Sequence, residues 1–453
     1  MELNDEQNRQ SLLASDRRYV WHAFGPSRQD AWMVDSADGV YVTDVDGRRY
    51  LDAMSGLWCV NAGYGHERIA RKVYEQMVRL PYYPLSAAHE PAAVLAEKLN
   101  EWLEGDYRVF FGSSWSEANE TAFKLARQYH TLLGRPMRYK IISRYRAYHG
   151  ATLGALSATG QHQRKFGYEP MAPGFIHIHP PDPYREAEGQ DQALYGEQAA
   201  QQLEMAIVWE GSDTVAAFVM EPIITGGGVL VPPANYLPRV AEICRQYGVL
   251  LIVDEVICGF GRTGKNFGFQ HSGVQPDIVT MAKGLTSAYL PLSATAVSRE
   301  VAEVFADSEE QDARFRQVNT FGGHPVSCAA ALENLAIFEE LGLVARSARL
   351  GELFLAQMNL LRDLPNVGDV RGMGLLAGIE LVEDKKTKVP LRFEAVTRIV
   401  AECKERGVIV GRTADTVGGF NNVITVAPPL TVEEDQIRLI VDSLRMAIAN
   451  WSV

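Results

Sequence analysis

The sequence lacks the cysteine spacing of a disulfide framework or of a zinc site. Its five cysteines are odd in number, and no two of them form a CxxC pair; they are Cys59, Cys244, Cys258, Cys328 and Cys403. Small disulfide-stapled folds and cysteine zinc sites depend on such pairs. We therefore predict neither structural disulfides nor a bound metal, and we expect a reducing, cytoplasmic location.

Long hydrophobic runs are also missing. The longest apolar stretches, such as residues 249–253, are far shorter than the run of about 20 residues that a membrane-spanning helix needs. The first fifteen residues, MELNDEQNRQSLLAS, have no apolar segment of the kind that signal peptides carry. We expect no membrane association.

A surplus of basic residues is absent as well. The chain has 44 Lys and Arg residues against 56 Asp and Glu residues, a formal net charge of −12. A protein that grips nucleic acid neutralises phosphates with basic side chains, so we expect no nucleic-acid partner. The negative charge does not exclude one phosphorylated cofactor, because such a cofactor needs only a local pocket.

Chain length allows more than one domain. With 453 residues, of which 47% are hydrophobic, the chain has room for two or three domains around a substantial core.

The pattern of hydrophobic residues changes along the chain. Residues 39–52 predict a hairpin around Asp46-Gly47, and residues 66–80 place apolar side chains at helical spacing. From about 105 to 325, short apolar runs alternate with helical segments; examples are VAAFVMEP, VLLIVDE and DIVTMAKG. Parallel strands that are covered by helices on both faces have this character. The middle of the chain therefore predicts an α/β domain.

The last 120 residues mix strand and helix patterns. Residues 371–381 and 421–430 have strand patterns, and Thr431 with Glu434 predicts a capping box at the start of a closing helix. We expect an N-terminal segment (1–75) and a C-terminal segment (331–453) to form a smaller α+β domain. Residues 76–330 are expected to form a large domain with a mainly parallel sheet.

The stretch from 249 to 285 carries the strongest chemical signal. One predicted strand ends at Asp254, and another ends just before Lys283. Ligands of open α/β sheets lie beyond the carboxyl ends of the strands, so both side chains are expected to face one crevice. A lysine that forms an imine and a carboxylate that keeps a pyridine nitrogen protonated are what pyridoxal phosphate requires. A surface lysine and a strand-end salt bridge remain the alternative at this point.

Motifs along almost the whole chain resemble the class III aminotransferases, which depend on pyridoxal phosphate and have fold type I. The resemblance is carried by VDEVICGFGRTGK with MAKGL, and by SGLWCVNAGYGH, YRAYHG, EPIITGGGVLVPP, NTFGGHP and VRGMGLL. Within the class, PYYPL, YEPMAPGFIH and AYLPLSATAV are most similar to the taurine:pyruvate and amine:pyruvate branch. Any one motif is weak, and their common order makes the resemblance specific.

The resemblance implies a role for each matching residue. Lys283 is expected to be the Schiff-base lysine and Asp254 the partner of the pyridine nitrogen. The other implied cofactor contacts are Val256 on one face of the ring, Tyr148 on the opposite face, His149 beside it, Glu221 as a pocket carboxylate, and Thr320, which reaches the phosphate from the partner subunit of a homodimer or a dimer of dimers. Taken alone, Tyr148 and Thr320 are ordinary core or loop residues.

The expected phosphate site departs from the family pattern. Residues 112–130, GSSWSEANETAFKLARQYH, end a strand and open a helix, with Ser114 or Ser116 as N-cap. A helix N-terminus suits a phosphate, although a merely structural capped helix has the same pattern. The family normally has glycine in place of Trp115 and asparagine in place of Ser113. Tryptophan at positive φ is an outlier.

We consider three interpretations of Trp115: its indole points out of the phosphate cup, it reshapes the pocket or a dimer contact, or the residue is an engineered substitution. Because every flanking motif is intact, we favour the last. The hypothesis is that Trp115 weakens cofactor retention or alters the substrate range.

The resemblance also implies how substrates bind. Leu57 and Trp58 match residues that line the substrate pocket, and Arg412 matches approximately the arginine that binds the carboxylate of the amino acceptor. The implied reaction moves an amino group from an amine or ω-amino acid to pyruvate through a Lys283 Schiff base and pyridoxamine phosphate. Another enzyme of the same family, a decarboxylase or an aminomutase, is the alternative.

A nucleotide-binding protein is the alternative from another class. Residues 259–265, GFGRTGK, fit the bare patterns GxxxxGK and GxGxxG. However, Asn266 stands where a phosphate-binding loop needs Ser or Thr for magnesium. The glycines and proline that follow do not favour the helix that either pattern opens.

Overall fold

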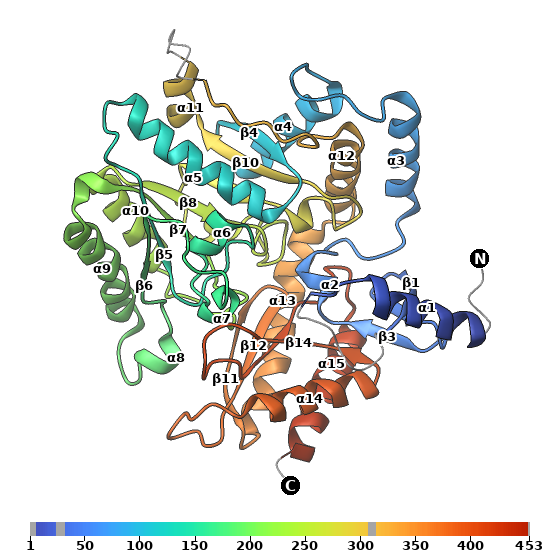
Figure 1. The fold of residues 1–453 in the computed structure, drawn as a ribbon. Coiled ribbons are helices and arrows are strands. Elements are labelled where there is room, and N and C mark those ends of the chain that lie inside the picture. Colours follow the sequence, from blue (N-terminus) through green and yellow to red (C-terminus); the bar gives the residue numbers. More distant parts are fainter. Residues whose placement is uncertain (1–5, 24–31, 307–313, 452–453) are drawn as a thin grey trace.

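The computed structural model describes residues 6–23, 32–306 and 314–451. A central sheet of seven strands carries most of the chain (Figure 1). Its spatial order is β4-β10-β9-β8-β7-β5-β6, and β10 runs antiparallel to both of its neighbours. The remaining pairs are parallel, which confirms the predicted α/β architecture. The strands are β4 (Tyr107–Gly112), β5 (Lys140–Arg144), β6 (Phe175–Ile178), β7 (Val215–Met220), β8 (Leu250–Asp254), β9 (Ile278–Met281) and β10 (Ser293–Ser298).

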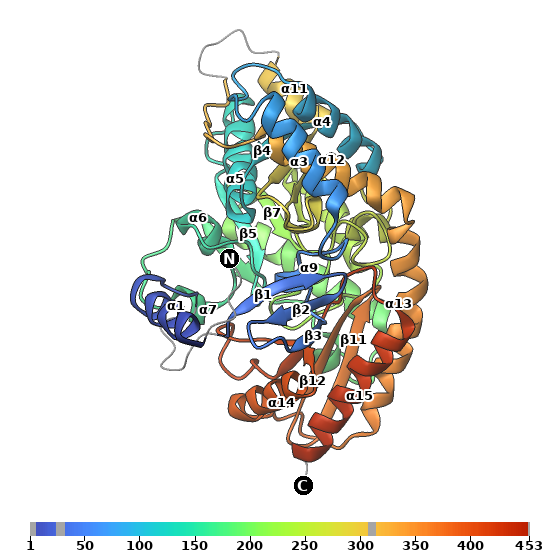
Figure 2. The ribbon, with the colours of Figure 1, turned by 90° about the vertical axis from the view of Figure 1, so that its right-hand side faces the viewer.

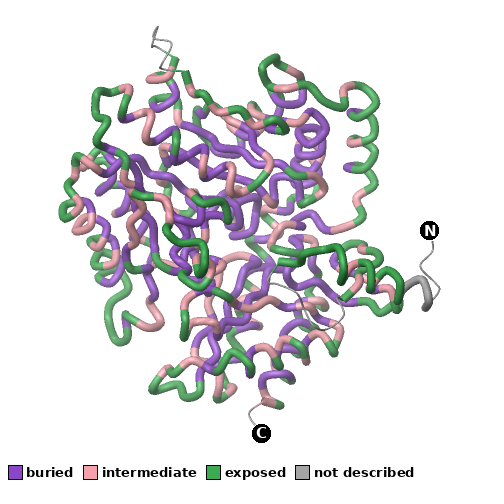
Figure 3. Tube along the Cα trace, viewed as in Figure 1, coloured by how far each residue is buried: buried purple, intermediate pink, exposed green. Residues whose placement is uncertain are grey.

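The middle strands of this sheet form the core. Every residue of β7, β8 and β9 is buried. Burial on both faces explains why these strands are continuous apolar runs in the sequence. Buried segments gather around this sheet, whereas the N-terminal helix is exposed (Figure 3). The helices of this part are α4 (Glu90–Leu103), α5 (Trp115–Leu132), α6 (Leu153–Ala158), α7 (His162–Lys165), α8 (Pro183–Glu186), α9 (Gln192–Glu210), α10 (Tyr236–Tyr247), α11 (Arg299–Ala306) and α12 (Pro325–Glu340).

Two smaller sheets lie below the large sheet in the turned view (Figure 2). One has the order β1-β2-β3-β13 and the other β11-β12-β15-β14. The parallel pairing of β3 with β13 joins the N-terminal segment to the last third of the chain. The domain boundaries at 75/76 and 330/331 stay a prediction. The strands are β1 (Val34–Asp38), β2 (Tyr41–Asp44), β3 (Arg49–Asp52), β11 (Val367–Met373), β12 (Leu376–Leu381), β13 (Val408–Ile409), β14 (Gly411–Arg412) and β15 (Val423–Val426).

Helices at both ends of the chain complete the fold. They are α1 (Glu6–Tyr19), α2 (Ser55–Trp58), α3 (Glu67–Arg79), α13 (Leu343–Asn359), α14 (Phe393–Glu405) and α15 (Glu434–Trp451). The hairpin predicted at Asp46-Gly47 and the helix predicted over 66–80 are both confirmed, by the pairing of β2 with β3 and by α3. Over the residues described, no helix is both long and apolar enough to cross a membrane.

Two local predictions were wrong. Residues 371–381 do not form one strand, because Gly374 adopts a φ of 57° and turns the chain between β11 and β12. The capping box of Thr431 and Glu434 does not form either, since α15 begins only at Glu434. The Thr431 hydroxyl is buried without a hydrogen-bond partner among the described residues, and the side chain of Gln436 accepts the Glu433 N–H.

Candidate active site

Asp254 and Lys283 follow neighbouring parallel strands. Asp254 is the last residue of β8 and pairs in register with Thr280 of β9, three positions before Lys283. Asp254 is buried, and burial lowers the pKa of the partly buried Lys283 while the charge of Asp254 acts in the opposite direction. The backbone at Lys283 has a φ of 45°, a sparsely populated conformation of the kind that gathers at functional sites.

The Asp254 carboxylate is held by hydrogen bonds on both oxygens. Its Oδ2 accepts from Trp115 Nε1 at 2.7 Å, Asn119 Nδ2 at 2.8 Å and His149 Nδ1 at 2.9 Å. Its Oδ1 accepts from the Val256 N–H at 3.2 Å. A carboxylate that accepts hydrogen bonds from several donors is fixed in position. These contacts orient Asp254 toward the space beside Lys283.

Tyr148 is positioned through its backbone by a buried acid. The Tyr148 N–H donates to Glu221 Oε1 at 3.1 Å, and Glu221 Oε2 accepts from the N–H and hydroxyl of Thr225 at 3.1 and 2.8 Å. Burial raises the pKa of Glu221 above its ordinary value. The guanidinium of Arg164 lies 5.2 Å from the centre of the Tyr148 ring. Glu221 therefore supports the segment that presents Tyr148.

The N-terminus of α5 lies beside the same region, because its first residue, Trp115, reaches Asp254. Ser114 is the N-cap, and its Oγ accepts from the Glu117 N–H at 3.3 Å. The Glu117 carboxylate accepts the Ser113 N–H, and Ser116 Oγ accepts the Ala151 N–H at 2.9 Å. The first amides of a helix have no partner within the helix and carry the positive end of its dipole. This end of α5 can therefore hold a phosphate.

Trp115 points into the site. Besides its bond to Asp254, its ring centre lies 4.8 Å from that of Tyr148, and the Lys283 Nζ lies 4.3 Å from the indole centre. The interpretation that the indole points out of the cup is therefore wrong. The expected backbone strain is absent too, because Trp115 is the first residue of α5 and is not among the residues of positive φ. That Trp115 is an engineered substitution stays a prediction.

The residues predicted to contact substrate lie in different environments. Lys283 Nζ lies 5.3 Å from the ring centre of Trp58, whose buried Nε1 has no partner among the described residues. Leu57 is exposed, and so is Thr320. The Arg412 guanidinium lies 4.3 Å from the centre of the Phe393 ring. Burial lowers the pKa of Arg412, and the nearby charge of Asp415 partly offsets this effect. Trp58 thus adjoins Lys283, whereas Arg412 stacks on Phe393.

Sequence reasoning missed Asn119 and Arg164. Asn119 is buried, donates to Asp254 Oδ2 and to the His149 carbonyl, and accepts from the Thr280 hydroxyl. It stands four positions after Trp115 in α5, so the two side chains share a face of the helix. That spacing is the signal that could have revealed Asn119. The position of Arg164 gave no such signal.

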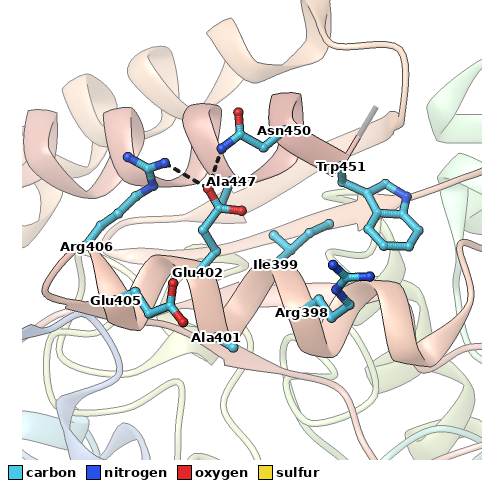
Figure 4. Close-up of a pocket in the computed structure, with 9 residues that line it drawn as sticks. All are labelled: Arg398, Ile399, Ala401, Glu402, Glu405, Arg406, Ala447, Asn450 and Trp451. Atoms are coloured by element: carbon cyan, nitrogen blue, oxygen red, sulfur yellow. Dashed lines mark hydrogen bonds and ion pairs between the residues drawn. The ribbon is translucent and has the colours of Figure 1, made fainter. Parts of the chain in front are cut away.

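A separate pocket lies between α14 and α15 (Figure 4). Its lining includes Glu402, which accepts from Arg406 and Asn450. None of the predicted site residues lines it.

The segment that fits the nucleotide-binding patterns has a different structure. Residues 259–267 form turns and lead into a 3-10 helix (Gly268–His271), so this described segment lacks the strand–loop–helix of a nucleotide-binding loop. Among the residues described, no cluster of three His, Cys, Asp or Glu could hold a metal ion.

A family model described as aminotransferase class-III matches residues 25–448. The chain belongs to the class III aminotransferases. It is 56% identical over 446 residues to the uncharacterized aminotransferase YhxA of Bacillus subtilis, covering 98% of each chain. It is 42% identical to a hypotaurine/taurine–pyruvate aminotransferase of Paracoccus denitrificans, covering 97% of each. The crystal structure of a Bacillus anthracis aminotransferase superposes with a TM-score of 0.96 at 51% identity, covering 98% of this chain and 99% of that one.

Enzymes of this family depend on pyridoxal phosphate, and the donor set of this aminotransferase fits that cofactor. A lysine, a fixed carboxylate, a tyrosine and a helix N-terminus surround one site. One side chain stands in the way, because the Trp115 indole bridges from the Asp254 carboxylate to the Lys283 amine. The donor groups thus match the cofactor, whereas the Trp115 indole occupies the space between Asp254 and Lys283.

Proposed function

We propose that this aminotransferase transfers the amino group of an amine or ω-amino acid donor to pyruvate, with Lys283 as the reacting lysine. The observation that carries the proposal is that a lysine amine and a carboxylate contact one aromatic ring, that of Trp115, the carboxylate at its N–H and the amine over its centre. A relative at 42% identity whose name specifies hypotaurine or taurine and pyruvate supports the choice of donor and acceptor. Among the donors we include simple arylalkyl amines and polyamines.

Bound pyridoxal phosphate supplies a carbonyl group that accepts the donor nitrogen and a ring that withdraws electrons from the neighbouring carbon. In our proposal, Lys283 is the residue that would bind the cofactor through its carbonyl group, and Asp254 would hold its ring nitrogen. Val256 and Tyr148 flank the ring, and the N-terminus of α5 holds the phosphate. The bonds from His149 and Asn119 keep Asp254 in place for this task.

Lys283 then serves as the base. Burial lowers the pKa of its amine, so a larger fraction is neutral near neutral pH than for an exposed lysine. The neutral Nζ would take the proton from the donor carbon and hold it as an ammonium until it is given back. Because one amine carries the proton both ways, replacing Lys283 removes catalysis and leaves the binding groups in place.

The substrate is proposed to lie beside Trp58 and Leu57. The unpaired Nε1–H of Trp58 supports this, because a buried donor without a partner is costly unless a ligand satisfies it. Arg412 is proposed to bind the pyruvate carboxylate, since a guanidinium matches a carboxylate through two parallel hydrogen bonds. To do so, the side chain has to leave the Phe393 ring.

We also propose a homodimer or a dimer of dimers, in which Thr320 reaches the phosphate in the partner subunit. Thr320 is exposed in the single chain, and its neighbours Val318 and Phe321 are 92% and 63% exposed. Large apolar side chains gathered on a surface favour association. A second copy of the chain would cover them.

A donor panel tests the proposal. Purified protein at saturating pyridoxal phosphate is incubated with pyruvate and with taurine, β-alanine, a diamine or an arylalkyl amine, and alanine is measured. We expect alanine with at least one donor, none with Lys283→Ala, and unchanged activity with Lys265→Ala, which removes an exposed lysine. Alanine formation by Lys283→Ala near the wild-type rate would contradict the proposal. Stoichiometric release of carbon dioxide without alanine would favour a decarboxylase.

A further inference from the structure

The indole of Trp115 makes the contacts that we assign to the cofactor ring. Its N–H donates to the Asp254 carboxylate at 2.7 Å, where the ring nitrogen is proposed to bind. Its ring meets Tyr148 edge to face at 4.8 Å, and the Lys283 amine lies 4.3 Å from its centre. The Trp115 side chain therefore contacts Asp254, Tyr148 and Lys283 at the same time.

This arrangement gives each of the two charged groups a favourable contact. The indole N–H gives Asp254 a hydrogen bond, and the indole face attracts the Lys283 ammonium. No backbone strain opposes it, since Trp115 begins α5 without a positive φ. The indole is thus a stable occupant of the site.

We propose that Trp115 is a built-in competitor of the cofactor: its indole closes the ring position in the free protein and has to leave Asp254 before pyridoxal phosphate binds there. This inference rests on the proposed function, because it takes Asp254, Tyr148 and Lys283 as the cofactor's contacts. It makes loading with cofactor, rather than turnover of the loaded enzyme, the step that Trp115 controls.

The size of the effect follows from the contact that is lost. A hydrogen bond to a buried charge shifts an equilibrium by about 10- to 100-fold. Trp115→Ala removes both the N–H and the ring, so it should tighten cofactor binding by about that factor. Trp115→Phe keeps an aromatic ring and loses the N–H donor, so its affinity should lie between those of Trp115→Ala and the wild type. Trp209→Phe is the matched control, because Trp209 is 78% exposed on α9.

The rate of cofactor binding gives a second test, which does not depend on comparing dissociation constants. If the indole has to leave first, the observed rate of cofactor binding to the wild type levels off as the cofactor concentration rises. In Trp115→Ala the rate should instead rise linearly over the same range. Circular dichroism of each apoprotein checks that the variants are folded.

The experiment measures pyridoxal phosphate binding by equilibrium dialysis and by stopped-flow tryptophan fluorescence. We expect the affinity order Trp115→Ala, then Trp115→Phe, then the wild type together with Trp209→Phe. Equal dissociation constants for the wild type and Trp115→Ala, with linear loading in both, would overturn this inference and leave the proposed function standing. If no form binds the cofactor, the proposed function fails and the inference fails with it.

Discussion

Replacing Asn119 by alanine should destabilise the protein strongly. Asn119 is fully buried and makes three hydrogen bonds: to Asp254 Oδ2 at 2.8 Å, to the His149 carbonyl at 2.7 Å, and from the Thr280 hydroxyl at 2.9 Å. A bond to a charged group contributes about 1.5–3 kcal/mol and each neutral bond about 1 kcal/mol. We therefore expect the free energy of unfolding of Asn119→Ala to fall by about 3–5 kcal/mol.

Urea unfolding of the apoprotein, followed by circular dichroism and by tryptophan fluorescence, measures this loss where the two transitions coincide. Asn334→Ala is the control. Asn334 is equally buried, but its Nδ2 donates only to the neutral carbonyls of Gly284 and Leu285, each at 3.0 Å. We expect it to lose about 2 kcal/mol. A loss for Asn119→Ala no larger than that for Asn334→Ala would refute the assignment of Asn119 as a support of a buried charge.

Two further predictions concern pH and the acceptor. Burial lowers the pKa of His130 from 6.5 to about 4, so its contribution to stability is present above pH 6.5 and is lost as the pH falls toward 4. His130→Gln should lose less stability than the wild type across that range in urea unfolding; equal losses would contradict this. Arg412→Ala should raise the KM for pyruvate about tenfold or more and leave the KM of an uncharged amine unchanged, with Arg412→Lys between them. Parallel changes in both KM values would exclude Arg412 as the carboxylate site.

The strand ends that carry Asp254 and Lys283 could be predicted because both strands are buried on both faces. Such strands are continuous apolar runs, and a polar residue that ends the run marks the edge of the sheet. The register of β8 with β9 then brings the two residues together. The family motifs pointed to the same pair.

The direction of the Trp115 side chain could not be predicted. It depends on a bond to Asp254, which lies 139 positions away in the sequence. Helical spacing from Trp115 places Asn119 on the same face of α5, but its bonds depend on partners from β8, β9 and the segment after β5. The turn at Gly374 was missed because the residues on both sides of it have strand patterns. Local patterns predict elements well, whereas contacts between distant side chains need the fold.

Chemical trapping of the cofactor tests the central claim most directly. Wild type and Trp115→Ala are saturated with pyridoxal phosphate, reduced with borohydride, digested, and analysed by peptide mass spectrometry. We predict that the cofactor mass is found on Lys283 in both proteins, and that Lys283→Ala, although still able to bind the cofactor, carries no such adduct. Attachment at another lysine, or full retention of the adduct in Lys283→Ala, would contradict the assignment of Lys283 as the reacting lysine.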